Sequence, residues 1–87
     1  MPEPRGEVRE ELEEVVRAMV DHPDQVEVWE VPEGRTVRLE LAVDPEDLGK
    51  VIGRQGRTAR ALRSFLDVRG AREGARYELK ILEEEDL

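Results

Sequence analysis

The chain has 87 residues, of which 38% are hydrophobic and 41% are charged, and it contains no cysteine. This length suits one small domain with a modest core, and the missing thiols exclude disulfides and thiolate metal sites and are compatible with a cytoplasmic location, which we expect. The apolar runs are too short to span a membrane, and the N-terminus lacks the apolar segment of a signal peptide.

The net charge of −8 argues at first against a nucleic-acid partner, because basic patches are the usual sign of one. The distribution of charge reverses this argument. Residues 1–49 carry five basic and fifteen acidic side chains, whereas residues 50–80 carry nine basic and three acidic ones, and residues 81–87 add four acids. The positive charge is therefore concentrated in one segment.

Residues 7–21 are predicted to form an amphipathic helix, because apolar side chains recur there at helical spacing. These side chains are Val8, Leu12, Val15, Val16, Met19 and Val20. Pro23 cannot continue a helix, so we expect the helix to stop at the segment 21–24. His22 is the only histidine, and we expect it at a helix end rather than in a site, since no metal-ligand or catalytic companion is evident.

Two strands are predicted next, over residues 25–31 and 35–43, with a turn at residues 32–34. The second strand alternates clearly, with Val37, Leu39, Leu41 and Val43 on one face, and the short connection predicts an antiparallel hairpin. Trp29 breaks the alternation of the first strand and should point away from the helices. It either covers its own sheet or favours association of two chains.

A helix start is predicted at Asp44 and Pro45, with Asp44 as the capping residue. The short helix that follows ends at Gly53, and a second helix is predicted from about Gly56 to Asp67. We expect a loop over residues 69–74, a last strand over 75–82 and an acidic tail over 83–87. The order α-β-β-α-α-β predicts a single α+β domain, with a three-stranded sheet covered by helices on one face.

The two short helices are joined by Gly53-Arg54-Gln55-Gly56, a G-x-x-G loop. Gly53 can adopt the left-handed backbone that ends a helix, and Gly56 permits close approach of a phosphodiester. The next helix offers free N–H groups to an anion. A helix-turn-helix corner with two turn glycines is the alternative for an isolated match. The arginines at 54, 57, 60 and 63 could likewise be a solvated helix face, although such faces usually mix both signs and this one has no acid before Asp67.

In this setting the chain resembles a type II KH domain over residues 8–82, and more narrowly the small stand-alone KH proteins of bacteria, the KhpA type. The residues that carry the resemblance are the string Val51-Ile52-Gly53-Arg54-Gln55-Gly56-Arg57-Thr58-Ala59-Arg60-Ala61-Leu62-Arg63 and the preceding residues 44–50. The resemblance implies an RNA-binding protein, an RNA chaperone or post-transcriptional regulator that holds about four nucleotides of single strand.

The resemblance also assigns roles to residues of this chain. Gly53, Arg54, Gln55 and Gly56 would hold the sugar–phosphate backbone. Lys50, Arg57 and Arg60 would supply charge. Val51 or Ile52, with part of the last strand, would form an apolar floor under the bases, and at least one of the two must be core. Relatives of this type are associated with a homodimer, or a heterodimer with a larger KH-domain protein, and with cell elongation and division.

An enzyme is not predicted, because no Ser/His/Asp or Cys/His set is present. Gly49, Gly53 and Gly56 do not match a dinucleotide-binding motif, and we expect no cofactor, metal or small-molecule substrate. The alternative function is a protein-interaction module with a KH fold and weak or lost RNA binding. Its acidic first helix and tail would suit a basic partner.

Overall fold

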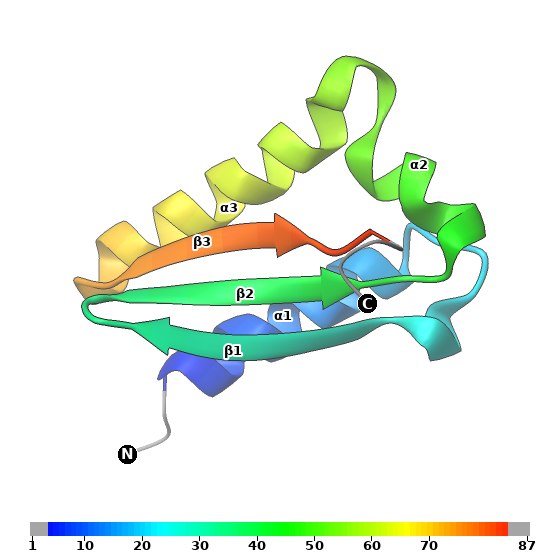
Figure 1. Cartoon of the computed structure of the whole chain (residues 1–87). Coiled ribbons are helices and arrows are strands. Elements are labelled where there is room, and N and C mark those ends of the chain that lie inside the picture. The colour runs from blue at the N-terminus through cyan, green and yellow to red at the C-terminus, as the bar shows by residue number, and fades with distance from the viewer. Residues whose placement is uncertain (1–3, 84–87) are drawn as a thin grey trace.

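The computed structural model describes residues 4–83 (Figure 1). Its helices and strands are α1 (Pro4–Arg17), β1 (Glu27–Glu33), β2 (Thr36–Ala42), α2 (Leu48–Ile52), α3 (Arg57–Glu73) and β3 (Arg76–Ile81). Three short 3₁₀ turns lie in the connections of this part of the chain: η1 (Pro23–Gln25), η2 (Pro45–Asp47) and η3 (Arg54–Gly56). The predicted α+β class and the order α-β-β-α-α-β are confirmed, whereas residues 84–87 of the predicted acidic tail lie outside the described residues.

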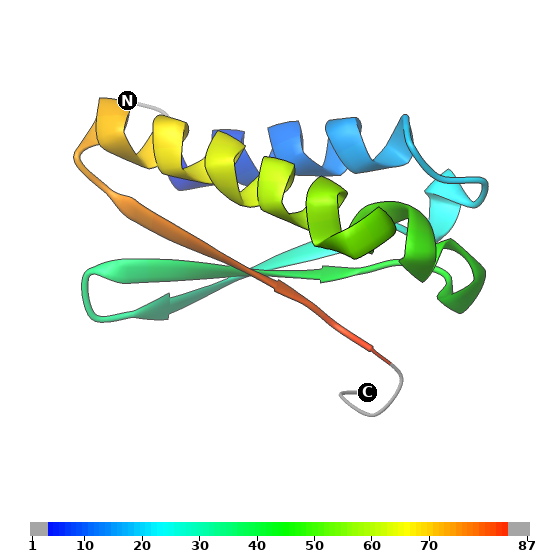
Figure 2. The same ribbon diagram turned by 90° about the horizontal axis from the view of Figure 1, so that it is seen from above.

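The sheet has the order β1-β2-β3, so β2 is the central strand. β1 and β2 are antiparallel, as predicted, and a two-residue turn at Gly34 and Arg35 joins them. β3 runs parallel to β2, which requires a crossover, and α2 and α3 provide it. Figure 2 shows that α1 and α3 cover the same face of the sheet and leave the other face open.

The predicted turn at residues 32–34 begins too early, because β1 continues to Glu33. Pro32 lies within β1, opposite Val37 of β2. Proline is tolerated there because β1 is an edge strand, which need not donate on its outer side.

The core lies between the covered face of the sheet and the helices. Every second residue of β2 is buried. One apolar stripe of α1 is buried as well, on the side that faces the sheet. The fully buried apolar side chains are Val8, Leu12, Val16, Val26, Leu39, Leu41, Val51 and Leu66. Trp29 lies on the opposite face with 43% of its surface exposed, so its predicted direction is confirmed.

α1 ends at Arg17 rather than near Asp21, so the predicted C-terminal boundary is wrong. In a longer helix the N–H groups of Asp21 and His22 would donate to carbonyl groups of the preceding turn. Here they donate instead to the carboxylate of Asp47. Val15, predicted to be on the core stripe, is 42% exposed. No helix between residues 4 and 83 is long and apolar enough to cross a membrane.

α3 continues to Glu73, so the loop predicted over residues 69–74 is also wrong. Gly70 is a buried residue within the helix, where a Cβ atom would lie 2.6 Å from the carbonyl oxygen of Ala75. The chain turns at Gly74, whose φ of 68° is a left-handed helix end, and the Ala75 N–H donates to the Gly70 carbonyl over 2.9 Å. Gly70 thus serves close packing of α3 on β3 rather than a turn.

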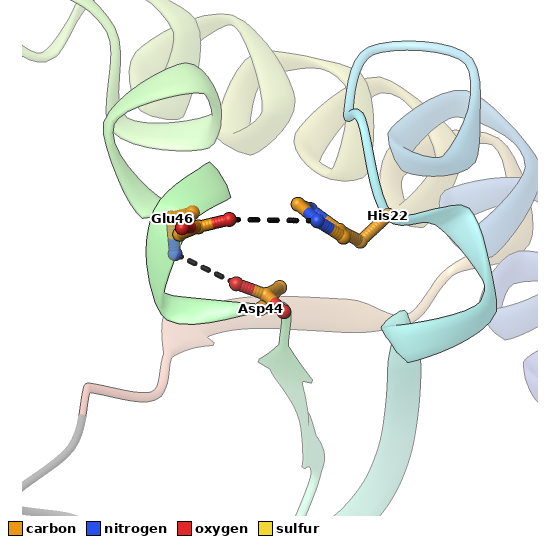
Figure 3. A group of neighbouring side chains, drawn as sticks. All are labelled: His22, Asp44 and Glu46. Atoms are coloured by element: carbon orange, nitrogen blue, oxygen red, sulfur yellow. Dashed lines mark hydrogen bonds and ion pairs between the residues drawn. The ribbon is translucent and has the colours of Figure 1, made fainter.

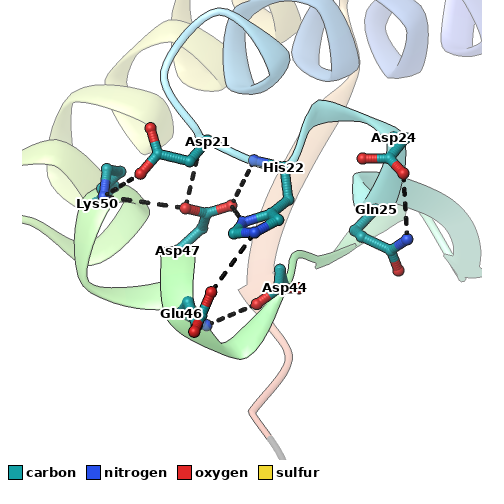
Figure 4. Close-up of polar contacts among 8 residues, drawn as sticks. All are labelled: Asp21, His22, Asp24, Gln25, Asp44, Glu46, Asp47 and Lys50. Atoms are coloured by element: carbon teal, nitrogen blue, oxygen red, sulfur yellow. Dashed lines mark hydrogen bonds and ion pairs between the residues drawn. The ribbon is translucent and has the colours of Figure 1, made fainter.

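A buried carboxylate connects the end of α1 to the start of α2. Asp47 is 0% exposed and accepts from the N–H groups of Asp21 at 3.1 Å and His22 at 2.9 Å. Its Oδ2 is also 3.0 Å from Nδ1 of His22, and Nζ of Lys50 lies 3.9 Å from Oδ1 (Figure 4). His22 therefore has a carboxylate companion that the sequence did not indicate, because the two residues are 25 positions apart.

The other ring nitrogen of His22 faces two more acids. Nε2 lies 3.5 Å from Oε1 of Glu46, and Oδ1 of Asp44 accepts from the N–H of Glu46 at 2.9 Å (Figure 3). The latter contact confirms Asp44 as the predicted capping residue, at η2. Possible ligand atoms of His22, Asp44 and Glu46 lie within 4.8 Å of one another, and capping and ion pairing account for all three side chains.

These contacts shift two pKa values in opposite directions. The hydrogen bond to Asp47 is the main cause that raises the pKa of His22 above its ordinary 6.5. Burial by itself would raise the pKa of Asp47, but the hydrogen bonds from the Asp21 N–H and from the ring and N–H of His22 outweigh burial and lower it.

We expect Gly70→Ala to destabilise the fold. The new methyl group would meet a backbone oxygen at 2.6 Å, and such overpacking costs about 1–3 kcal/mol, more than the roughly 1 kcal/mol that alanine gains over glycine in a helix. Gly49→Ala is the matched control, since nothing lies within 4 Å of its Cβ position, and it should be neutral or slightly stabilising. Urea unfolding of both variants checks this, and a Gly70→Ala protein as stable as the wild type would contradict the packing role.

The free energy of unfolding should decrease as the pH rises above about 6.5. The pKa of His22 is higher in the folded than in the unfolded chain, so its contribution is complete below the unfolded value of 6.5 and is lost as the pH rises through the folded value. The contribution of Asp47, whose pKa is lowered, is present above 3.8 and is lost only as the pH falls through its folded value. Urea denaturation at a series of pH values should show this slope in the wild type and a smaller one in His22→Gln. Equal slopes would disprove the assignment to His22.

Candidate nucleic-acid interface

The loop between α2 and α3 has an unusual backbone. Gly53, which ends α2, has φ 78° and ψ 167°, and Gln55 and Gly56 have φ 56° and 72°. The Gly53 conformation is accessible essentially to glycine alone, and a Cβ atom there would lie 2.3 Å from Oγ1 of Thr58. The glycine at 56 is required by its left-handed backbone rather than by space, since the nearest atom to its Cβ position is 3.4 Å away.

Local hydrogen bonds hold this loop in one shape. The Gly53 N–H donates to the Gly49 carbonyl at 2.8 Å, and the Gly56 N–H donates to the Gly53 carbonyl at 3.0 Å. Nη1 of Arg60 donates to the backbone carbonyl of Gln55 at 2.8 Å. Arg60, predicted only as a source of charge, therefore also supports the tip of the loop.

The N-terminus of α3 opens directly onto the loop. Gly56 is its capping residue and offers no side-chain oxygen, and the first turn contains no acid. The Arg57 N–H donates to the Arg54 carbonyl, but the N–H groups that follow it in the first turn of this 17-residue helix are left to water or to an anion. Arg54 and Arg57, both exposed, lie beside these groups.

The predicted cations differ in their surroundings. Nζ of Lys50 lies 3.1 Å from the carboxylate of Asp21, and this hydrogen bond raises the pKa of Lys50, so it remains charged. Nη2 of Arg57 donates to the Gln55 side chain at 3.3 Å. No ion pair of Arg54 is found in the described part of the chain. Arg54 is therefore the cation at the loop for which protein groups compete least with a phosphate.

Of the two apolar residues before the loop, Val51 is fully buried and Ile52 is partly exposed. The expectation that at least one of them is core is met by Val51. It holds α2 against the domain, so Ile52 is the residue of this pair that remains accessible to a ligand.

A hollow lies between α3 and β3, and these two elements lie side by side in Figures 1 and 2. This open groove of about 280 Å³ is lined by Arg63, Asp67, Tyr77, Glu78 and Leu79. Nη2 of Arg63 donates across it to the Leu79 carbonyl at 3.4 Å. The sequence indicated the last strand in general, but these residues come together only because α3 packs against β3.

Residues 9–81 match the family model of the KhpA/KhpB KH domain. The chain is 46% identical over 72 residues to the RNA-binding protein KhpA of Halalkalibacterium halodurans, covering 83% of this chain and 95% of that protein. It is 50% identical over 72 residues to the proteins of the same name from Aquifex aeolicus and Streptomyces coelicolor, covering 83% of this chain and 91% and 90% of theirs. With the type II order of elements and the glycine loop between α2 and α3, these matches show that the chain belongs to the KhpA/KhpB family of KH domains.

Proposed function

We propose that this protein is a non-catalytic RNA-binding protein that holds about four nucleotides of single-stranded RNA at the loop and along the groove between α3 and β3. The observation that carries the proposal is the loop itself. Its positive-φ glycines, the uncapped N-terminus of α3 and the neighbouring arginines form a site for a phosphodiester backbone. Relatives that carry the name RNA-binding protein support it.

In this proposal Gly53, Arg54, Gln55 and Gly56 contact the sugar–phosphate backbone. Lys50, Arg57 and Arg60 supply charge around it. Ile52 and the outer edge of β3 form the apolar floor for the bases, with Val51 beneath as support. Stacking contributes little, because none of the three aromatic side chains lies at the loop and Tyr77, which lines the groove, is only 3% exposed.

We propose a cellular role as an RNA chaperone or post-transcriptional regulator in the cytoplasm. This role, with an influence on cell elongation and division, rests on the resemblance to small bacterial KH proteins. The proposed RNA site does not depend on this cellular role, because it is argued from the loop geometry of this chain.

A protein-interaction module is the second candidate, and one feature of α1 favours it. An exposed hollow on this helix is lined by Glu7, Glu10, Glu11 and Glu14. A basic protein would be attracted to this surface, whereas RNA would be repelled from it. The two functions therefore use different faces of the molecule.

Replacing Arg54 and Gln55 together by Asp should abolish RNA retention, because two carboxylates would then face phosphates. Both side chains are exposed and Asp tolerates the left-handed backbone of position 55, so stability should change by only about 0.5 kcal/mol. The matched control is Arg35→Asp with Gln25→Asp, the same change in charge at exposed positions outside the loop. Gel shift with single-stranded RNA checks the prediction, and equal retention by both double variants would exclude the loop as the site.

Salt dependence separates the two candidate functions. About three or four phosphate contacts from Lys50, Arg54, Arg57 and Arg60 predict a slope of log K against log salt of roughly −2 to −3 for single strands. Affinity measured by fluorescence anisotropy over a range of KCl concentrations gives this slope. A flat dependence would favour the protein-interaction module.

We also propose that the protein forms a homodimer or pairs with a larger KH-domain protein. Trp29 is 43% exposed on the open face of the sheet, where an apolar ring favours association, although a ring that only covers its own sheet is the alternative. The resemblance to dimeric relatives also suggests a second contact around Phe65 and Leu66 of α3. Phe65 is partly exposed there, whereas Leu66 is fully buried and unavailable.

Light scattering at micromolar concentration should give about twice the 10.0 kDa mass of one chain for the wild type and a lower value for Trp29→Ala. Val15→Ala is the control, because Val15 has a similar exposure of 42% on the helical side. A wild type that stays at the mass of one chain at every concentration would remove the homodimer and leave the RNA site unaffected.

A further inference from the structure

The helix that carries the loop is too short to be stable by itself. α2 has five residues, less than two turns, and isolated helices of this length are not stable in water. Val51 is its only buried side chain. In the first turn Leu48 packs against the core but is only partly buried. Apolar contacts of α2 are therefore few, and a polar contact helps to fix the direction in which the helix approaches Gly53.

Asp47 supplies that contact. It stands directly before α2, at the position where an aspartate usually accepts from its own helix, yet it makes no such capping bond. Its carboxylate turns instead to the connection between α1 and β1 and accepts from Asp21 and His22, residues 26 and 25 positions away. Both carboxylate oxygens are used in this way, and the side chain is fully buried.

The same carboxylate is linked to charge at the loop. Lys50 lies one turn along α2 and is shared between Asp47 at 3.9 Å and Asp21 at 3.1 Å. Gly53 lies three residues after Lys50, and its N–H donates to the carbonyl of Gly49 in α2. A displacement of the first turn of α2 would therefore be passed to the loop through one short rigid segment.

We infer that Asp47 is a positioning residue for the RNA-binding loop, acting by fastening the first turn of α2 to the α1–β1 connection. The effect of Asp47 on RNA binding rests on the proposed function, but its effect on the position of the loop is measurable without RNA. Asp47 contacts no ligand itself, since it is buried beneath the turn that it holds.

The RNA arm of the test compares Asp47→Asn with Val8→Ala. The amide places an NH₂ group where the carboxylate accepts from backbone N–H groups, whereas Val8→Ala removes buried methyl groups from the start of α1, at the other end of that helix from the α1–β1 connection. Affinity for a short fluorescent single-stranded RNA is measured where circular dichroism shows that both variants are fully folded. We expect about 3- to 30-fold weaker binding by Asp47→Asn, the usual range for residues that act without touching the ligand, and no change for Val8→Ala. Equal affinities of the two variants would overturn the inference.

The second arm uses the wild-type protein alone, so it decides the question even if Asp47→Asn does not fold. The ring of His22 is faced by Asp44, Glu46 and Asp47, and Lys50 contacts the same Asp47 carboxylate. Protonation of the ring strengthens its hydrogen bond to Asp47 and should be felt at the loop. In a ¹⁵N–¹H NMR titration between about pH 5 and 8, the Gly53 and Gly56 amides should shift with the midpoint of His22.

The amide of Gly34, in the hairpin turn, is the control and should not follow that midpoint. Loop amides that stay unchanged while His22 titrates would overturn the inference. A wild type that binds no RNA would refute the proposed function instead, and the loop amides would then decide alone whether Asp47 positions the loop.

Discussion

The apolar face of β2 is the constraint on which the rest of this structure depends. Leu39 and Leu41, at the centre of the sheet, are 0% exposed, and α1 and α3 must both lie over this one face to cover it. Since β3 is parallel to β2, the chain has to cross the same face between these two strands. The crossover is α2, the glycine loop and α3, so the geometry that buries the core also brings the loop to one end of the domain.

A chain with net charge −8 can present a site for a polyanion because its charges are segregated. The domain measures 36 × 24 × 24 Å, and at physiological salt the interaction between exposed charges is largely screened beyond about 8 Å. A phosphate held at the proposed loop site would therefore interact mainly with Arg54, Arg57 and the free N–H groups in the first turn of α3. The acids along the outer face of α1 would then chiefly disfavour RNA elsewhere on the surface.

Local sequence patterns predicted those features that depend on neighbours in the chain. The strict alternation of Val37, Leu39 and Leu41 predicts β2, and Asp44-Pro45 predicts the start of the turn before α2. Gly53 predicts a positive φ at the end of the helix, and the structure has it there and at Gly56 as well. The prediction from the local pattern was wrong at Gly70. This residue looks like a turn residue in the sequence, but it lies within α3, where the helix packs closely on the chain leading into β3. The prediction was wrong again at the end of α1, where the competing acceptor for the backbone N–H groups is Asp47.

The sequence by itself determined the class of fold, the order of the elements, the G-x-x-G loop and the concentration of positive charge around it, because each is encoded by residues close together in the chain. Only the tertiary structure decided which apolar residue before the loop is buried, which cations are shared with acids, and how α2 is held. Val51 and Ile52 are equivalent in a sequence pattern, but only one of them can point into the core. Asp47 and His22 are 25 residues apart and meet because the end of α1 and the start of α2 lie at the same end of the sheet. Contacts of this kind depend on packing of distant segments, which no local periodicity specifies.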